Sequence, residues 1–139
     1  MRDPEIRLDR DCAVSTARLW EVLVTPSLWW GKEVRLEPCA GGVFHEPWRD
    51  SAGEHNTRGE VVAYEPPSCL ALSWRDDDWT FDTHVTFVLA EKGEGSSLLL
   101  CHGGWKGAPQ HLQDRLLSSH RQGWRYHLDN LVACAERAP

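Results

Sequence analysis

The feature that most constrains the fold is a single change in the spacing of apolar residues along the chain. From residue 33 to 104, apolar side chains recur at about every second position, as in strands that are half-buried in a sheet. Across residues 110–137 they recur at steps of three and four, which places them on one face of a helix. The sequence therefore predicts a sheet of consecutive strands followed by one long helix.

Turn-forming residues divide the period-two region into short strands. Clusters rich in Gly, Pro, Asp and Ser interrupt the alternation at regular intervals, which predicts a meander of about six strands. The clearest predicted strands span residues 57–65, 69–74, 82–91 and 97–103. On the last two, the alternation puts Val85, Phe87 and Leu89 on one face, and Leu98, Leu100 and His102 on one face.

The segment before the sheet predicts a strand and two short helices. Residues 5–12 alternate polar and apolar side chains, as a strand does. Ser15 is a suitable N-cap for a following helix, which the pair Thr25-Pro26 stops. Thr25 as cap and Pro26 at the first helical position then predict a second helix that ends near Trp29-Trp30.

Length and composition predict one domain over residues 1–139, in a chain that is 41% apolar. The longest apolar stretches are only a few residues, so no membrane span is expected. Residues 1–5 are polar and lack the apolar core of a signal peptide, so we expect a cytoplasmic protein. The five cysteines are an odd number without CxxC spacing, which favours free thiols over disulfides.

The net charge and the aromatic content limit the classes of partner that we expect. The net charge is −6 and the basic residues form no stripe, so nucleic acid is not an expected partner. Eight tryptophans accompany only two tyrosines and three phenylalanines. Tryptophan is large and carries one N–H that needs a partner, so this excess suits the wall of a cavity or an interface, as well as an ordinary core.

Several short motifs occur in an order that resembles a known family. They are residues 17–26 (ARLWEVLVTP) with Trp29-Trp30, residues 37–44 (EPCAGGVF), residues 59–61 (GEV), residues 65–70 (EPPSCL) with Ser73-Trp74, residues 83–87 (THVTF), residues 100–105 (LCHGGW), and Gly123-Trp124 with Leu128 and Leu131. Together they resemble the domains related to the activator of heat-shock protein 90 ATPase, within the START and birch-pollen-allergen superfamily.

The resemblance implies a helix-grip fold of the α+β class. In that fold a curved antiparallel sheet of six to seven strands wraps around a long C-terminal helix, with a short helix pair after the first strand. The superfamily includes lipid carriers, cyclases, hormone receptors and co-chaperones, so the resemblance implies a fold more strongly than a function.

A sheet that curls around a helix leaves an elongated space between them, which predicts a site for a small hydrophobic ligand. The expected ligand-binding side chains come from the inward faces of the strands and from the helix. They are Phe44, Trp74, Phe87, Leu100, His102, Leu116, His120, Gly123, Trp124 and His127.

Two of these positions have alternative interpretations. Gly123 in mid-helix costs about 0.5–1 kcal/mol relative to alanine, so it either opens a notch in a cavity wall or lets Trp74 or Trp105 approach the helix. His102 ends an apolar row, so it is either a hydrogen-bonded core residue or a group that orients a ligand.

The sequence predicts no nucleophile, metal site or cofactor. Cys101 and His102 are adjacent on a strand and point to opposite faces, so the histidine cannot activate the thiol. Asp82 and His84 have same-face spacing, but no third metal ligand accompanies them. The acidic run at residues 76–78 predicts a solvated loop, because like charges in a row repel one another unless water screens them.

Three functions follow from this interpretation. The first is non-catalytic binding or transport of a small hydrophobic molecule in the cavity. The second is a cyclase-type enzyme that uses His102, His120 or Glu46 to move protons there. The third is a module that binds a chaperone or a regulator through an exposed Trp29-Trp30 patch. The sequence leaves open whether the chain forms a homodimer or has another protein partner.

Overall fold

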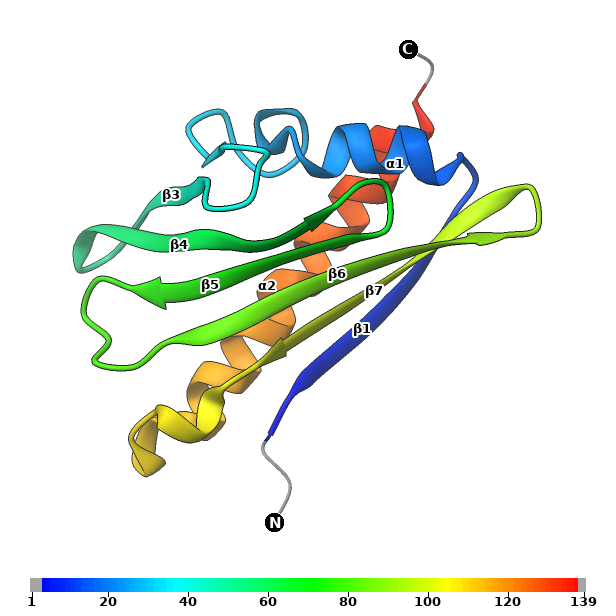
Figure 1. Ribbon diagram of the computed structural model, residues 1–139. Helices are drawn as coiled ribbons and strands as arrows, with labels where there is room; N and C mark the ends of the chain where they lie inside the picture. Colours follow the sequence, from blue (N-terminus) through cyan, green and yellow to red (C-terminus); the bar gives the residue numbers. More distant parts are fainter. Residues whose placement is uncertain (1–3, 138–139) are drawn as a thin grey trace.

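The computed structural model describes residues 4–137 and contains the predicted order of elements (Figure 1). In chain order these are β1 (Ile6–Cys12), α1 (Thr16–Leu23), the 3-10 turn η1 (Pro26–Leu28), β2 (Arg35–Leu36), β3 (Val43–Asp50), β4 (Gly53–Glu65), β5 (Cys69–Asp76), β6 (Thr83–Lys92), β7 (Gly95–Gly103), the 3-10 turn η2 (Trp105–Gly107) and α2 (Gln110–Glu136).

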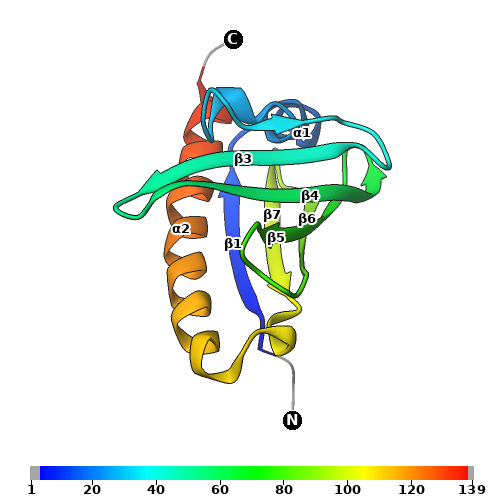
Figure 2. The ribbon, with the colours of Figure 1, turned by 90° about the vertical axis from the view of Figure 1, so that its left-hand side faces the viewer.

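All seven strands belong to one antiparallel sheet with the order β1-β7-β6-β5-β4-β3-β2. The sheet is strongly curved: β1 runs alongside α2, whereas β3 and β4 cross the direction of the helix (Figure 2). The α1 helix closes one end of the arrangement and η2 leads into α2 at the other. The predicted α+β class and the helix-grip fold are confirmed.

The inward faces of the central strands form the core. Val85, Phe87 and Leu89 of β6 are buried, as the period-two spacing predicts. Leu98 and Leu100 of β7 are buried beside them, and the register places Phe87 opposite Leu100. The alternation of side chains in the sequence therefore identifies the face of the sheet that packs against the helix.

Helix α2 packs tightly on the sheet through its C-terminal half only. Its buried residues are Trp124, Leu128, Leu131 and Ala135. Leu116 continues the same apolar stripe toward the N-terminus of the helix but is only half-buried. The two halves of one amphipathic helix thus have different surroundings, although their sequence spacing is the same.

The helix pair after β1 begins as predicted and ends differently. The Ser15 hydroxyl accepts a hydrogen bond from the Arg18 N–H at 3.2 Å, which confirms the predicted N-cap. Thr25 does not act as a side-chain cap, because its hydroxyl donates to the Glu21 carbonyl at 2.8 Å. The predicted second helix is a three-residue 3-10 turn from Pro26 to Leu28.

The predicted exposed patch of Trp29 and Trp30 is wrong. Trp29 is 7% exposed, and the Trp30 ring lies 5.2 Å from Phe44 and 5.3 Å from Trp124, centroid to centroid. Both indoles turn toward the interior because the 3-10 turn folds this segment back over the sheet and α2. The sequence basis for a chaperone- or regulator-binding patch at this position is therefore lost.

The five cysteines are free thiols, as predicted. Over residues 4–137, no helix is long and apolar enough to cross a membrane. Within the same residues, no group of three or more His, Cys, Asp or Glu side chains is placed to hold a metal ion.

His102 is a hydrogen-bonded core residue. Thr83 donates its hydroxyl proton to the Trp74 carbonyl at 2.8 Å, so its oxygen is free to accept from His102 Nε2 at 2.8 Å. The Trp124 indole N–H donates to His102 Nδ1 at 3.0 Å. These partners require the neutral tautomer with its proton on Nε2. Burial, reinforced by the nearby His120 and His84, holds the pKa of His102 well below its ordinary value.

We expect His102→Ala to lower the free energy of unfolding by about 3 kcal/mol, because it leaves a cavity and removes the partners of Trp124 and Thr83. His84→Ala is the matched control, because His84 is exposed on the neighbouring strand. The control should stay within about 0.5 kcal/mol of the wild type. Urea titrations of the three proteins measure the difference, and equal losses in both variants would contradict this role of His102.

Candidate ligand-binding cavity

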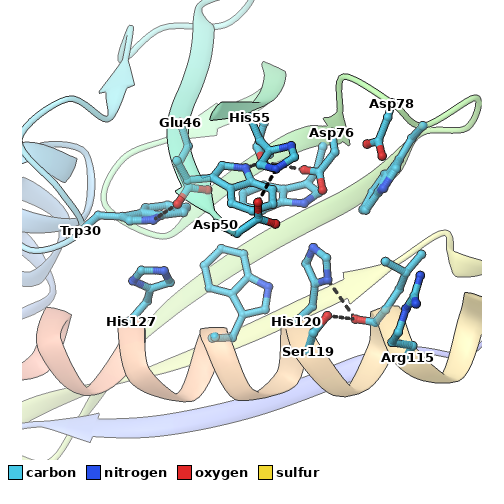
Figure 3. Close-up of a pocket in the computed structure, with 17 residues that line it drawn as sticks. Trp30, Glu46, Asp50, His55, Asp76, Asp78, Arg115, Ser119, His120 and His127 are labelled. Atoms are coloured by element: carbon cyan, nitrogen blue, oxygen red, sulfur yellow. Dashed lines mark hydrogen bonds and ion pairs between the residues drawn. The ribbon is translucent and has the colours of Figure 1, made fainter. Parts of the chain in front are cut away.

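A cavity of about 590 Å³ lies between the N-terminal half of α2 and the inward faces of β3, β4 and β5 (Figure 3). Its volume falls within the range of about 300–1,000 Å³ that is usual for small-molecule sites. The lining residues are Trp30, Glu46, Trp48, Asp50, His55, Thr57, Trp74, Asp76, Asp78, Trp79, Arg115, Leu116, Ser119, His120, Gly123, Trp124 and His127.

The helix wall is a single face of α2. Leu116, His120, Gly123 and His127 follow one another at steps of three and four, so these positions lie on the same face of the helix. A Cβ atom built on Gly123 meets nothing within 4 Å. The glycine therefore leaves open space at the cavity wall, which supports the notch interpretation over close packing of a tryptophan on the helix.

The sheet wall is built from rows of side chains that face one another across strands. Glu46 of β3 pairs with Thr57 of β4, and Thr57 pairs in turn with Asp76 of β5. Trp48 pairs with His55 in the next row of the β3–β4 hairpin, and their rings stack at 4.4 Å. The antiparallel register thus brings three polar groups from three strands into one row on the cavity side.

Hydrogen bonds hold the carboxylates of this wall in place. The Trp30 indole N–H donates to Glu46 Oε2 at 3.0 Å. The Trp48 indole donates to the Thr57 hydroxyl at 3.0 Å, and that hydroxyl donates to Asp76 Oδ1 at 2.5 Å. Two tryptophans that form the aromatic walls therefore also orient the acidic groups, one directly and one through a threonine.

Burial changes the charge of the groups in the cavity. It raises the pKa of Glu46 to about 7, although the Trp30 hydrogen bond opposes the change. It also raises the pKa of Asp76 above its ordinary value, against the hydrogen bond from Thr57. On the helix side, burial lowers the pKa of His120 and brings that of His127 to about 4. At neutral pH the two histidines are neutral, and Glu46 is close to half ionised.

The cavity mouth is charged. His55 Nε2 lies 2.7 Å from Asp50 Oδ1, and this hydrogen bond lowers the pKa of Asp50. Asp78 and Arg115 also line the cavity, from the β5–β6 loop and from α2 (Figure 3). Deeper in the site, the cavity-lining Trp74 Nε1 and His127 Nδ1 are buried without a hydrogen-bond partner among residues 4–137.

The ten residues predicted to contact a ligand separate into two groups. Those that line the cavity are Trp74, Leu116, His120, Gly123, Trp124 and His127. Phe44 and Phe87 lie behind this wall, around a void of only about 10 Å³, and Leu100 and His102 are fully buried in the core. Contact of any of them with a ligand stays a prediction.

Sequence reasoning missed most of the polar wall, although a signal for it exists. Glu46, Trp48 and Asp50 follow the buried Phe44 at every second position, so they share its face of β3. Asp76 continues the inward row of Trp74 in the same way. The expectation of a solvated loop at residues 76–78 is therefore wrong for Asp76, which ends β5 and bonds Thr57, whereas Asp77 is exposed.

A curved antiparallel sheet that grips a helix around an open cavity defines a helix-grip domain. The chain belongs to the family of Activator of Hsp90 ATPase homolog 1-like proteins, whose model matches residues 13–136. This confirms the family indicated by the sequence motifs. A comparison with functionally curated proteins found no match.

Solved structures share the fold. CalU16 from Micromonospora echinospora is 23% identical with a TM-score of 0.73, over 95% of this chain and 76% of that chain. Protein CV1439 from Chromobacterium violaceum is 20% identical with a TM-score of 0.76, and the match covers 96% of this chain and 98% of that chain. Mll3558 from Rhizobium loti is 17% identical with a TM-score of 0.78, and the match covers 96% of this chain and 97% of that chain. At these identities the likeness concerns the fold alone.

The raised pKa of Glu46 predicts a pH-dependent gain of stability in Glu46→Gln. Between pH 4.5, the ordinary pKa, and about 7, the folded wild type binds a proton that the unfolded chain does not, so its stability falls as the pH rises. Glutamine keeps an oxygen that accepts from Trp30 and carries no charge. Above pH 7 the variant should be more stable by up to about 3 kcal/mol, with no gain below pH 4.5.

Urea titrations at several pH values measure this gain. Glu60→Gln is the matched control, because Glu60 is an exposed residue of the same hairpin. The control should differ from the wild type by no more than about 0.5 kcal/mol at every pH. A Glu46→Gln gain that does not change with pH would contradict the burial of this carboxyl.

Proposed function

We propose that the protein binds, without transforming it, a small molecule with an apolar, aromatic body in the cavity between α2 and strands β3 to β5. The observation that carries the proposal is a cavity of about 590 Å³ with tryptophan walls and an open notch at Gly123. Five tryptophans line it: Trp30, Trp48, Trp74, Trp79 and Trp124. A space of this size with such walls fits a ligand of drug-like dimensions.

Removal of apolar area from water supplies the driving force, at about 25 cal/mol per Å². The tryptophan rings support one another in fixed positions, because Trp30 stacks on Trp74 at 5.9 Å and Trp74 contacts Trp124 at 5.2 Å. Rings that are already ordered lose little freedom when a flat ligand stacks on them, which favours binding.

A proton-transfer reaction in the same cavity is a second candidate, and Glu46 favours it. A carboxyl whose pKa is about 7 can both donate and accept a proton near neutral pH. It shares the cavity with His120 and His127, which burial keeps as neutral bases. Chemical change of a bound compound that is lost in Glu46→Gln would favour this candidate over simple binding.

Substitutions that fill the notch at Gly123 test the proposed function. Gly123→Ala should fold with equal stability or up to about 1 kcal/mol more, because alanine favours helix and its methyl group meets no atom within 4 Å. Gly123→Leu should fold and fill part of the cavity. Quenching of tryptophan fluorescence by quercetin, a flat aromatic probe, should show affinity that decreases from wild type to alanine to leucine.

The control for added bulk on the helix is Ser118→Leu, because Ser118 is an exposed residue of α2 that does not line the cavity. This variant should bind quercetin as the wild type does, and urea titrations check that every variant is folded. Equal quercetin affinity in wild type and Gly123→Leu would place the probe elsewhere. A wild type that binds no apolar aromatic probe would refute the proposed function.

A further inference from the structure

The cavity contains desolvated carboxylates that lack a positive partner. Glu46 bonds the Trp30 indole and Asp76 bonds the Thr57 hydroxyl, and neither forms an ion pair within residues 4–137. Buried charges in proteins are normally paired, because removal from water is costly for an isolated charge. Two neighbouring acidic groups on one wall therefore form a site that a positive charge would complement.

The remaining charges of the cavity do not supply that partner. Asp50 and Asp78 add two more carboxylates to the lining, and the His55 ring, which bonds Asp50 at 2.7 Å, also acts electrostatically on Asp76. Among the lining residues that the structure describes, Arg115 carries the one permanent positive charge, and it comes from the opposite wall near the mouth (Figure 3). Since His120 and His127 are neutral at pH 7, the cavity as a whole is negative.

The aromatic walls and one unsatisfied ring nitrogen also point to a cationic ligand. The faces of indole rings attract cations, most strongly where water is excluded. His127 has a ring nitrogen, Nδ1, without a hydrogen-bond partner at this wall. The unprotonated nitrogen of a neutral imidazole accepts a hydrogen bond, and an ammonium N–H is a suitable donor. A pure hydrocarbon would leave this nitrogen without a partner.

We infer that the ligand is a protonated amine on an aromatic body, with the ammonium group held between the Glu46–Asp76 row, the indole faces and His127. This inference rests on the proposed function and adds the sign of the ligand's charge. The aromatic body would occupy the space between Trp74 and the notch at Gly123. The ammonium group would be the missing counter-charge of the acidic row.

The test compares phenethylamine with propylbenzene, a neutral molecule of nearly the same shape. Calorimetric titrations of the wild type at pH 8, where Glu46 is mostly ionised, should show the amine binding at least about tenfold more tightly. This preference should shrink as the salt concentration rises. The comparison uses the wild type alone, so it does not depend on any variant that fails to fold.

Two isosteric variants then locate the charge. Glu46→Gln and Asp76→Asn keep an oxygen that accepts from Trp30 and from Thr57, and each should lower the preference for phenethylamine over propylbenzene several-fold. Asp114→Asn, at an exposed position of α2 outside the cavity, is the matched control and should change neither affinity.

The outcomes separate this inference from the proposed function. Equal affinity for the two probes, or tighter binding of propylbenzene, would overturn the amine and leave the proposed function standing. An amine preference that persists in both variants would also overturn it, because the charge would then be recognised elsewhere. If the protein binds neither probe and also fails to bind quercetin, the proposed function falls with it.

Discussion

The indole of Trp124 is the point at which α2 changes from packing on the sheet to lining a cavity. Its N–H is fixed by His102 at 3.0 Å, and its ring lies against Trp30, Trp74 and Phe87. On its C-terminal side, Leu128, Leu131 and Ala135 are buried. On its N-terminal side the same helix face borders open space. The cavity thus depends on an anchored half-helix that holds the other half away from the sheet.

The buried polar groups of the protein have two kinds of environment. His102 has a partner for each ring nitrogen, so its neutral form is part of the core. Glu46 and Asp76 also lie where water is scarce, but their only hydrogen bonds come from neutral donors. The first arrangement stabilises the fold. The arrangement of Glu46 and Asp76 leaves negative charge at the surface of the cavity, where a ligand can contact it.

Much of the fold could be predicted because it rests on local regularities. The alternation of Val85, Phe87 and Leu89 identified the buried face of β6, and the Ser15 cap identified the start of α1. The acidic wall was harder to predict. Period two does place Glu46 and Trp48 on the face of Phe44, but the same pattern would arise if these residues faced water at the sheet margin. The pairing of β3 with β4, and of β4 with β5, decides between the two.

The sequence by itself determined the order of the elements, the family and the buried faces, because period and turn chemistry are properties of neighbouring residues. Only the tertiary structure decided what each polar group does. Trp30 turned inward to bond Glu46, and Thr57 joined Trp48 to Asp76 across three strands. Leu116 and Gly123 border a cavity, whereas Leu128 on the same stripe is buried. These outcomes depend on the curvature of the sheet relative to the helix, and helical spacing within α2 contains no information about that curvature.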